Sequence, residues 1–247
     1  MTSISEIHIQ GTDTDPVLRA QVTLQVRNAE MLADLAAKVA LATELGLSPV
    51  HREQAREALA EFCSGPLLRH LQTADQVLYA VAAGAAETRL LVRALRIQHG
   101  LVADRVTDLN RADSADEVAT AAHALGTLLG ACQLVEQEVL VPALAVLPGV
   151  DLPALVEDVS TLLDGGVLET PEVLDVREIP HGRRHPRIFG TYARLTPGRS
   201  FVLVNNHDPK PLRREFQATF PDQFGWDYLE TGPDRWQVRI SVLPGHG

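Results

Sequence analysis

Residues 15–46 read DPVLRAQVTLQVRNAEMLADLAAKVALATELG, and this stretch decides how the first half of the chain folds. Apolar residues recur in it at steps of three and four, the spacing that places side chains on one face of an α-helix. Asp15 followed by Pro16 is typical of a helix start, and Gly46 is typical of a helix end. The stretch therefore predicts a long amphipathic helix whose apolar face carries one polar residue, Asn28.

The same periodicity continues to about residue 163 and predicts four further helices. The expected helices cover about residues 48–83, 85–109, 114–142 and 153–163. Gly65 and Pro66 predict a kink in the second helix. Ser114 and Glu117 have the spacing of a capping box at the start of the fourth. Short connections between long helices favour a four-helix up-down bundle, with the fifth helix outside it or acting as a linker.

Each of the four long helices places a polar side chain on its apolar face. Besides Asn28, these side chains are His70, His99, Cys132 and Glu136. A buried polar group costs free energy unless it has a partner, so polar groups at similar heights need a common explanation. They either hydrogen-bond to one another or form a shared site. Imidazole, thiolate and carboxylate together suit a transition metal such as iron or zinc.

Two segments carry a resemblance to a known family. HLQTADQVLY at residues 70–79 and CQLVEQEVLVP at residues 132–142 resemble the helix signature of hemerythrin-like proteins. In that family, His-x-x-x-Glu followed by Leu-x-Pro occurs on helices two and four, and helices one and three each supply a histidine to a di-iron site. The resemblance covers roughly residues 15–145. It implies that His70, His99 and Glu136 stand at positions of iron ligands.

The chain departs from the family pattern at three ligand positions. Asn28 stands where the first histidine is expected, Ala74 replaces the first carboxylate, and Cys132 replaces the last histidine. Asp75 is a poor substitute for the missing carboxylate because it lies about 100° further round the helix. We therefore expect one metal ion rather than an oxygen-bridged iron pair. A mononuclear iron, a haem in the enlarged cavity and an empty bundle are the alternatives.

The composition changes in the last third of the chain, which holds most of the aromatic residues. Strands are expected at residues 172–177, 201–204, 224–229 and 236–240, and helices at 186–195 and 209–220. This order predicts a small two-layer βαβαββ sandwich. The expected fold class is therefore mainly α followed by α/β, with a helical domain at 1–168 and an α/β domain at 169–247.

The C-terminal part also resembles a family. The segments LDVREIPHGRRHPRIF, FVLVNNHDPKPL and FGWDYLETGPDRWQVRI are similar to the domain of unknown function numbered 2249. That domain is related to the fold of the sulfur carriers TusA and SirA and is often joined to hemerythrin-like helices. Sulfur carriers use a cysteine near the first helix. Both cysteines of this chain, Cys63 and Cys132, lie outside the α/β part, so we do not expect it to carry a persulfide.

Histidines gather where the first two strands of this part are followed by helices. His185 follows His181, Arg183 and Arg184 after the first strand, and His207 precedes Asp208 after the second. The carboxyl ends of parallel strands meet at one edge of a sheet, where ligand sites are common. We expect His185, His207 and Asp208 to bind a cofactor, a metal or a small anion there. The alternative is that Asp208 and His185 only cap helices and that the arginines are solvated.

Charge and motif content exclude several classes of function. The formal net charge is −10, and the acidic excess lies in the first 170 residues, which argues against binding to nucleic acid. The N-terminus lacks a basic region followed by an apolar one, so we expect neither a signal peptide nor a transmembrane helix. The chain has only two cysteines, which is typical of a protein in the reducing cytoplasm. No phosphate loop or dinucleotide fingerprint occurs. Abundant arginine and alanine suggest a GC-rich bacterial gene.

Two classes of function fit these observations. The first is a redox protein that contains iron, as non-haem iron or haem, and handles nitric oxide, dioxygen or another small nitrogen species. The two resemblances imply this class. The second is a metal-free interaction module derived from a hemerythrin-like bundle. A site shared between the two domains is a further expectation, because active sites are common at domain interfaces.

Overall fold

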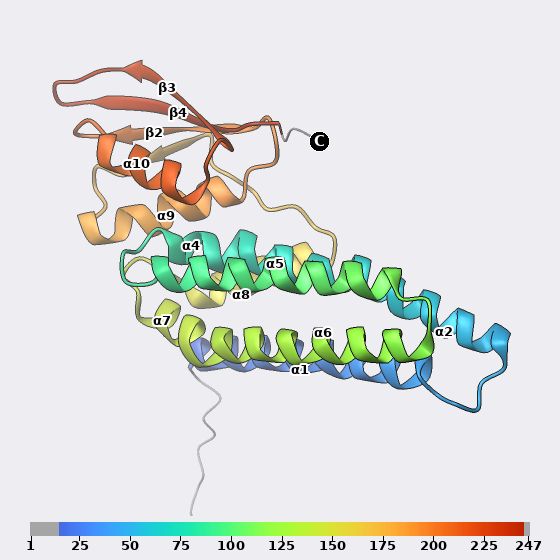
Figure 1. Ribbon diagram of the computed structural model, residues 1–247. Coiled ribbons are helices and arrows are strands. Elements are labelled where there is room, and N and C mark those ends of the chain that lie inside the picture. The colour runs from blue at the N-terminus through green and yellow to red at the C-terminus, as the bar shows by residue number, and fades with distance from the viewer. Residues whose placement is uncertain (1–14, 245–247) are drawn as a thin grey trace, which may run out of the picture.

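A computed structural model describes residues 15–244. His8 and His246, expected at the surface, lie outside the described residues. The protein is mainly helical, and a four-stranded mixed sheet lies in its C-terminal part (Figure 1). The expected class, helices followed by an α/β part, is confirmed at this level.

The helical half contains four long helical segments and a shorter one, close to the expected ranges. Three of its turns are π-helical rather than α-helical, and they interrupt the second and fourth segments without ending them. The elements are α1 (Pro16–Ala42), α2 (Pro49–Phe62), η1 (Cys63–Leu67), α3 (Leu68–Ala74), η2 (Asp75–Tyr79), α4 (Ala80–Ala83), α5 (Arg89–Arg111), α6 (Ala115–Val135), η3 (Glu136–Leu140), α7 (Val141–Val146) and α8 (Leu152–Leu163).

The two predicted helix caps are confirmed. The Asp15 carboxylate accepts a hydrogen bond of 2.9 Å from the Val17 N–H at the start of α1. At the start of α6, the Glu117 N–H donates to the Ser114 hydroxyl at 3.2 Å, and the Ser114 N–H donates to the Glu117 carboxylate at 3.0 Å. These bonds satisfy backbone donors that have no partner inside the helix.

We expect Ser114→Ala to lower the free energy of unfolding by about 1 kcal/mol, because the Glu117 N–H loses its acceptor. Urea unfolding followed by circular dichroism measures this change. Thr127→Ala is the matched control, because the Thr127 hydroxyl lies in the middle of α6 and donates only to the His123 carbonyl. An equal loss of stability in both variants would contradict the capping role.

Two helix ends were predicted wrongly, and each has a local cause. The fourth segment continues past Pro142 to Val146. The Val141 N–H bonds to the Glu136 carbonyl five residues back, and this wider turn accommodates the proline that follows. The third segment begins at Arg89 rather than near residue 85, because the Thr88 hydroxyl donates to the Ala82 carbonyl and closes a turn there. The kink predicted at Gly65 and Pro66 takes the form of η1.

The α/β half follows the predicted order of strands and helices. Its elements are β1 (Val173–Asp175), α9 (His181–Ala193), β2 (Ser200–Asn205), α10 (Lys210–Thr219), β3 (Phe224–Glu230) and β4 (Trp236–Val242). The strand order is β1-β2-β4-β3. β1 pairs parallel with β2, and the other two pairs are antiparallel. The parallel pair places both strand-to-helix junctions at one edge of the sheet.

Helix α9 begins earlier than predicted, at His181 instead of Pro186. The Arg183 N–H donates to the Pro180 carbonyl at 2.9 Å and starts the helix. Pro186 is tolerated in the second turn, where the missing N–H removes one helical bond. It also packs closely on the helical half, since a Cβ at Gly84 would lie 3.0 Å from the Pro186 Cα. The predicted loop from His181 to His185 is therefore helical, which corrects the sequence interpretation.

The two halves share one hydrophobic core. Helices α9 and α10 lie between the sheet and the helical half, with α9 against α4 (Figure 1). A single cluster of buried apolar residues includes Val77 and Val81 from the helical half and Phe189, Phe216 and Leu203 from the α/β half. Ion pairs also cross the interface, such as that between Arg89 and Glu215 at 3.1 Å. A large apolar interface of this kind favours a fixed arrangement of the halves.

Among the described residues, one helical segment, Ala115–Val146, is long and apolar enough to cross a membrane by length and composition alone. Of the 18 consecutive residues that are most apolar in this segment, 33% are buried. This segment packs against α1 and α5 in the structure. Such a segment is weak evidence for a membrane, because core helices of other proteins meet the same criterion.

Candidate functional site

The interior of the helical half contains a cluster of polar side chains around His70. His70 on α3 is 8% exposed, and its Nε2 lies 2.9 Å from the Oδ1 of Asn28 on α1. Two of the polar side chains expected on the apolar helix faces, Asn28 and His70, therefore hydrogen-bond to each other. Because Oδ1 is an acceptor, Nε2 carries the proton in this pair, and Nδ1 is the unprotonated nitrogen.

Asn28, His70 and Glu136 line one small cavity of about 10 Å³. This volume is close to that of one water molecule. Its remaining walls are apolar and consist of Leu24, Ala74, Leu78, Val141 and Val159. The short side chain of Ala74, where the suggested resemblance led us to expect a carboxylate, is part of this apolar wall.

Tyr79 connects this cavity to the outside of the helical half. The Tyr79 side chain is fully buried, and its hydroxyl lies 2.9 Å from the Nε2 of His99 on α5. The Tyr79 hydroxyl also lies near Glu136, where it favours the ionised carboxyl and so opposes a rise in the pKa of that group. His99 lines a groove of about 470 Å³ between α3 and α5. His99 and Tyr79 are therefore hydrogen-bonded to each other, and Tyr79 lies between the groove at His99 and the cavity at Glu136.

The protonation of the cluster follows from burial. Burial raises the pKa of Glu136 to about 7, although the Tyr79 hydrogen bond opposes the shift. Burial lowers the pKa of His70 and brings that of His99 to about 4. Burial, aided by the nearby Glu136 carboxylate, raises the pKa of Cys132 to about 11. At neutral pH both imidazoles and the thiol are therefore uncharged, and Glu136 is the group that changes charge there.

The four predicted metal ligands do not line one common site. His70 and Glu136 share the cavity, His99 lines the groove, and Cys132 is buried near Glu136 but lines neither. No three histidine, cysteine or carboxylate side chains in residues 15–244 lie close enough together to hold a metal ion. Counting the Asn28 amide, the cavity offers one nitrogen and two oxygen donors. This set fits one ion better than a pair.

Two π-helical turns border the cluster. Tyr79 is the last residue of η2, and Glu136 is the first residue of η3. Turns of this kind are frequent at functional sites because they change the direction of side chains within a helix. Sequence reasoning missed Tyr79 as a member of the cluster. The sequence feature that could have pointed to Tyr79 is the scarcity of aromatic residues, since Phe62 and Tyr79 are the only ones before residue 171.

The predicted site of the α/β half is only partly assembled. His207 lies beside His181, with ring centroids 5.7 Å apart, at the edge where β1 and β2 end. The Asp208 carboxylate accepts a hydrogen bond from the Tyr228 hydroxyl at 2.9 Å and pairs with Lys210. His185 points elsewhere, because its Nδ1 lies 2.9 Å from a Glu215 carboxylate oxygen on α10.

A buried arginine fixes this edge of the sheet. The Arg184 guanidinium donates to the Ile179 carbonyl at 2.6 Å, the Arg177 carbonyl at 3.1 Å and the Asn205 side chain at 3.2 Å. It therefore ties the two strand-to-helix junctions together. Partial burial and the charge of Arg184 lower the pKa of His207. The alternative that Asp208 caps α10 through its side chain is not observed, since the N-cap of that helix is Pro209.

Comparison with known proteins finds a family match in the α/β half. Residues 173–242 match a family described as uncharacterized conserved protein, DUF2249. A DUF2249 domain is therefore present, and the match does not extend to the helical half. No curated protein and no solved structure matches the chain.

Proposed function

We propose that the helical half binds a single transition metal ion, of the non-haem iron type, at His70 and Glu136. We further propose that the bound ion takes up a diatomic molecule such as nitric oxide or dioxygen. The observation that carries this proposal is the cavity that His70, Glu136 and Asn28 share. At about 10 Å³ it has room for a single ion and is far too small for a haem.

The chain's own residues suit this role. His70 is uncharged at neutral pH and can offer a nitrogen lone pair, while Glu136 can supply a negative charge. The bound ion would supply an open coordination position for the diatomic molecule. His99, Tyr79 and Glu136 extend from the groove to the cavity, so a proton can pass between the groove and the cavity through these side chains.

The proposal includes a hemerythrin-like up-down bundle for the helical half and a two-layer sandwich for the α/β half. Packing of α1 against α2 and α6, and of α5 against α6, supports the first. The order β1-β2-β4-β3, with α9 and α10 on the side of the helical half, supports the second. We place the protein in the cytoplasm, without a nucleic-acid or membrane partner.

Metal analysis and an absorption spectrum of the purified full chain test the proposal. We expect about one iron per chain after anaerobic loading with ferrous iron, and a spectral change on addition of nitric oxide. His70→Leu and Glu136→Gln should lose most of the iron. Each variant lacks one of the two side chains that would bind the ion, and the side chain that remains binds it too weakly alone. His123→Leu, an exposed position on α6, should retain it. A parent protein that takes up no iron would overturn the proposal.

The hydrogen bonds within the cluster favour the second candidate, a metal-free interaction module. His70 has Asn28 as its partner, and Tyr79 joins His99 to Glu136. Partners of this kind stabilise buried polar groups without a metal. The second candidate replaces the first if the parent protein binds no iron and its melting temperature is the same with and without added ferrous iron.

A further inference from the structure

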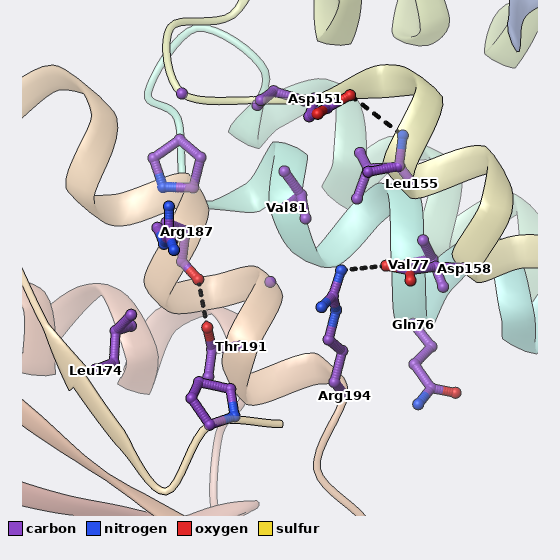
Figure 2. Close-up of a pocket in the computed structure, with 16 residues that line it drawn as sticks. Gln76, Val77, Val81, Asp151, Leu155, Asp158, Leu174, Arg187, Thr191 and Arg194 are labelled. Carbon is purple, nitrogen blue, oxygen red and sulfur yellow. Dashed lines mark hydrogen bonds and ion pairs between the residues drawn. The ribbon is translucent and has the colours of Figure 1, made fainter. Parts of the chain in front are cut away.

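A second cavity lies where the two halves meet (Figure 2). Its volume is about 260 Å³. The helical half contributes residues of η2, α4 and α8, and the α/β half contributes residues of α9 and β1. It is separate from the cavity at His70, although both use side chains of the segment that contains η2.

Close contacts between the halves shape this interface pocket. A Cβ at Gly190 of α9 would lie 3.0 Å from the Val81 side chain of α4. Gly149, at the start of the loop that leads to α8, has a φ of +84°, and a Cβ there would lie 2.7 Å from the Arg183 Cβ. Both glycines line the pocket, or its edge, at positions where a side chain has no room. The pocket is therefore a defined feature of the packing between the halves.

The walls of the interface pocket differ in polarity. Apolar side chains from both halves form one part of the lining, namely Val77, Val81, Val150, Leu155 and Leu174. Arg194 of α9 pairs with Asp158 of α8 across the interface, so these two charges neutralise each other (Figure 2). A ligand here meets an apolar surface together with the solvent-exposed charges of the lining that have no ion-pair partner.

Two charged residues of the lining make no ion pair within residues 15–244, and they come from opposite halves. Arg187 belongs to α9. Asp151 is the N-cap of α8, where its Oδ1 accepts the Ala154 N–H at 3.2 Å, and both Asp151 and Arg187 are exposed to solvent. An acid and a base without partners, beside an apolar surface, match a small molecule that carries both charges and an apolar group.

We propose that the interface pocket binds an α-amino acid with an apolar side chain. The ligand carboxylate pairs with Arg187, the ligand ammonium group pairs with Asp151, and the side chain packs on Val77, Val81 and Leu155. The volume suits such a ligand, because pockets for drug-sized molecules begin at roughly 300 Å³. The ligand then bridges the two halves and contacts η2, two residues away from Tyr79.

Calorimetric titration of the full chain with L-leucine tests this proposal. We expect binding of one leucine per chain. Two analogues each lack one charge: 4-methylpentanoate has no ammonium group, and 3-methylbutylamine has no carboxylate. Each should bind at least about tenfold more weakly than leucine, because one charged partner in the pocket is left without its ion pair. Equal binding of leucine and both analogues would show that only the apolar surface is recognised, and would overturn the proposal.

Variants assign the two charges. Arg187→Gln should weaken leucine binding about tenfold or more and leave binding of 3-methylbutylamine unchanged, since that analogue has no carboxylate. Asp151→Asn should show the converse pattern with 4-methylpentanoate, and asparagine still caps α8. Arg199→Gln and Asp164→Asn are controls at exposed positions outside the pocket. No heat with leucine, or leucine binding that neither pocket variant changes, contradicts the proposal. Iron uptake by Arg187→Gln should equal that of the parent, so the two proposals fail independently.

Discussion

In the metal-free protein, Glu136→Gln raises the free energy of unfolding at pH 8 by roughly 3 kcal/mol and changes it little at pH 4.5. The Glu136 carboxyl is 4% exposed, and its pKa rises from 4.5 to about 7 on folding. Below pH 4.5 the group is protonated in both the folded and the unfolded chain. Between pH 4.5 and 7 the unfolded chain loses this proton while the folded chain keeps it, so ionisation progressively destabilises the fold.

The magnitude follows from the size of the shift. Each pKa unit corresponds to about 1.4 kcal/mol, so the shift costs the native state roughly 3 kcal/mol above pH 7. Glutamine stays neutral at every pH and can still accept the Tyr79 hydrogen bond, so it avoids this cost. Both histidines of the cluster are present in parent and variant, and their own dependence on pH therefore largely cancels in the comparison.

Urea unfolding at pH 4.5 and pH 8, in the presence of a chelator, measures the effect. Glu138→Gln, an exposed carboxyl two residues further along η3, is the control and should change little at either pH. Equal stability of parent and Glu136→Gln at pH 8 would contradict a pKa of Glu136 that is raised by burial. With iron bound, the sign should reverse, because the variant then loses a ligand and the stability that metal binding confers.

Local signals in the sequence were sufficient to predict most helices and strands. Asp15 and Ser114 cap their helices through bonds to the next two or three residues, so nearby sequence determines them. The errors at Pro142 and Pro186 have different causes, a local one at Pro142 and packing against the other half at Pro186. A proline usually ends a helix, but η3 accommodates the first, and packing against Gly84 of the other half accompanies the second.

The candidate site was predictable only in part, for a related reason. Helical periodicity indicated that His70 and Glu136 face the interior, and they do. The periodicity assumes 3.6 residues per turn, whereas the π-helical turns η2 and η3 contain more and change which side chains meet. The sequence therefore did not reveal that Tyr79 joins His99 to Glu136. In the α/β half, the early start of α9 places His181, rather than His185, beside His207.

The shared core leads to the last prediction, that the two halves unfold together. Phe216 of α10 is fully buried, and its ring centroid lies 4.6 Å from that of Phe189 and 5.2 Å from that of Tyr192. Phe216→Ala removes these contacts and leaves a cavity, which should cost about 3–5 kcal/mol. Because the cluster around Phe216 continues into Val77 and Val81, the loss should destabilise the helical half as well.

Two optical signals separate the halves in this experiment. Both tryptophans, Trp226 and Trp236, lie in the α/β half, so their fluorescence reports on that half. Circular dichroism at 222 nm reports mainly on the helical half, which contains most of the helix. In the parent the two urea transitions should coincide, and in Phe216→Ala both should move to lower urea by the same amount. Leu229→Ala, at a position 45% exposed on β3, is the control and should move neither by much. If the fluorescence transition of Phe216→Ala moves alone, the halves fold independently, and the interface pocket between them is not held rigid by a common core.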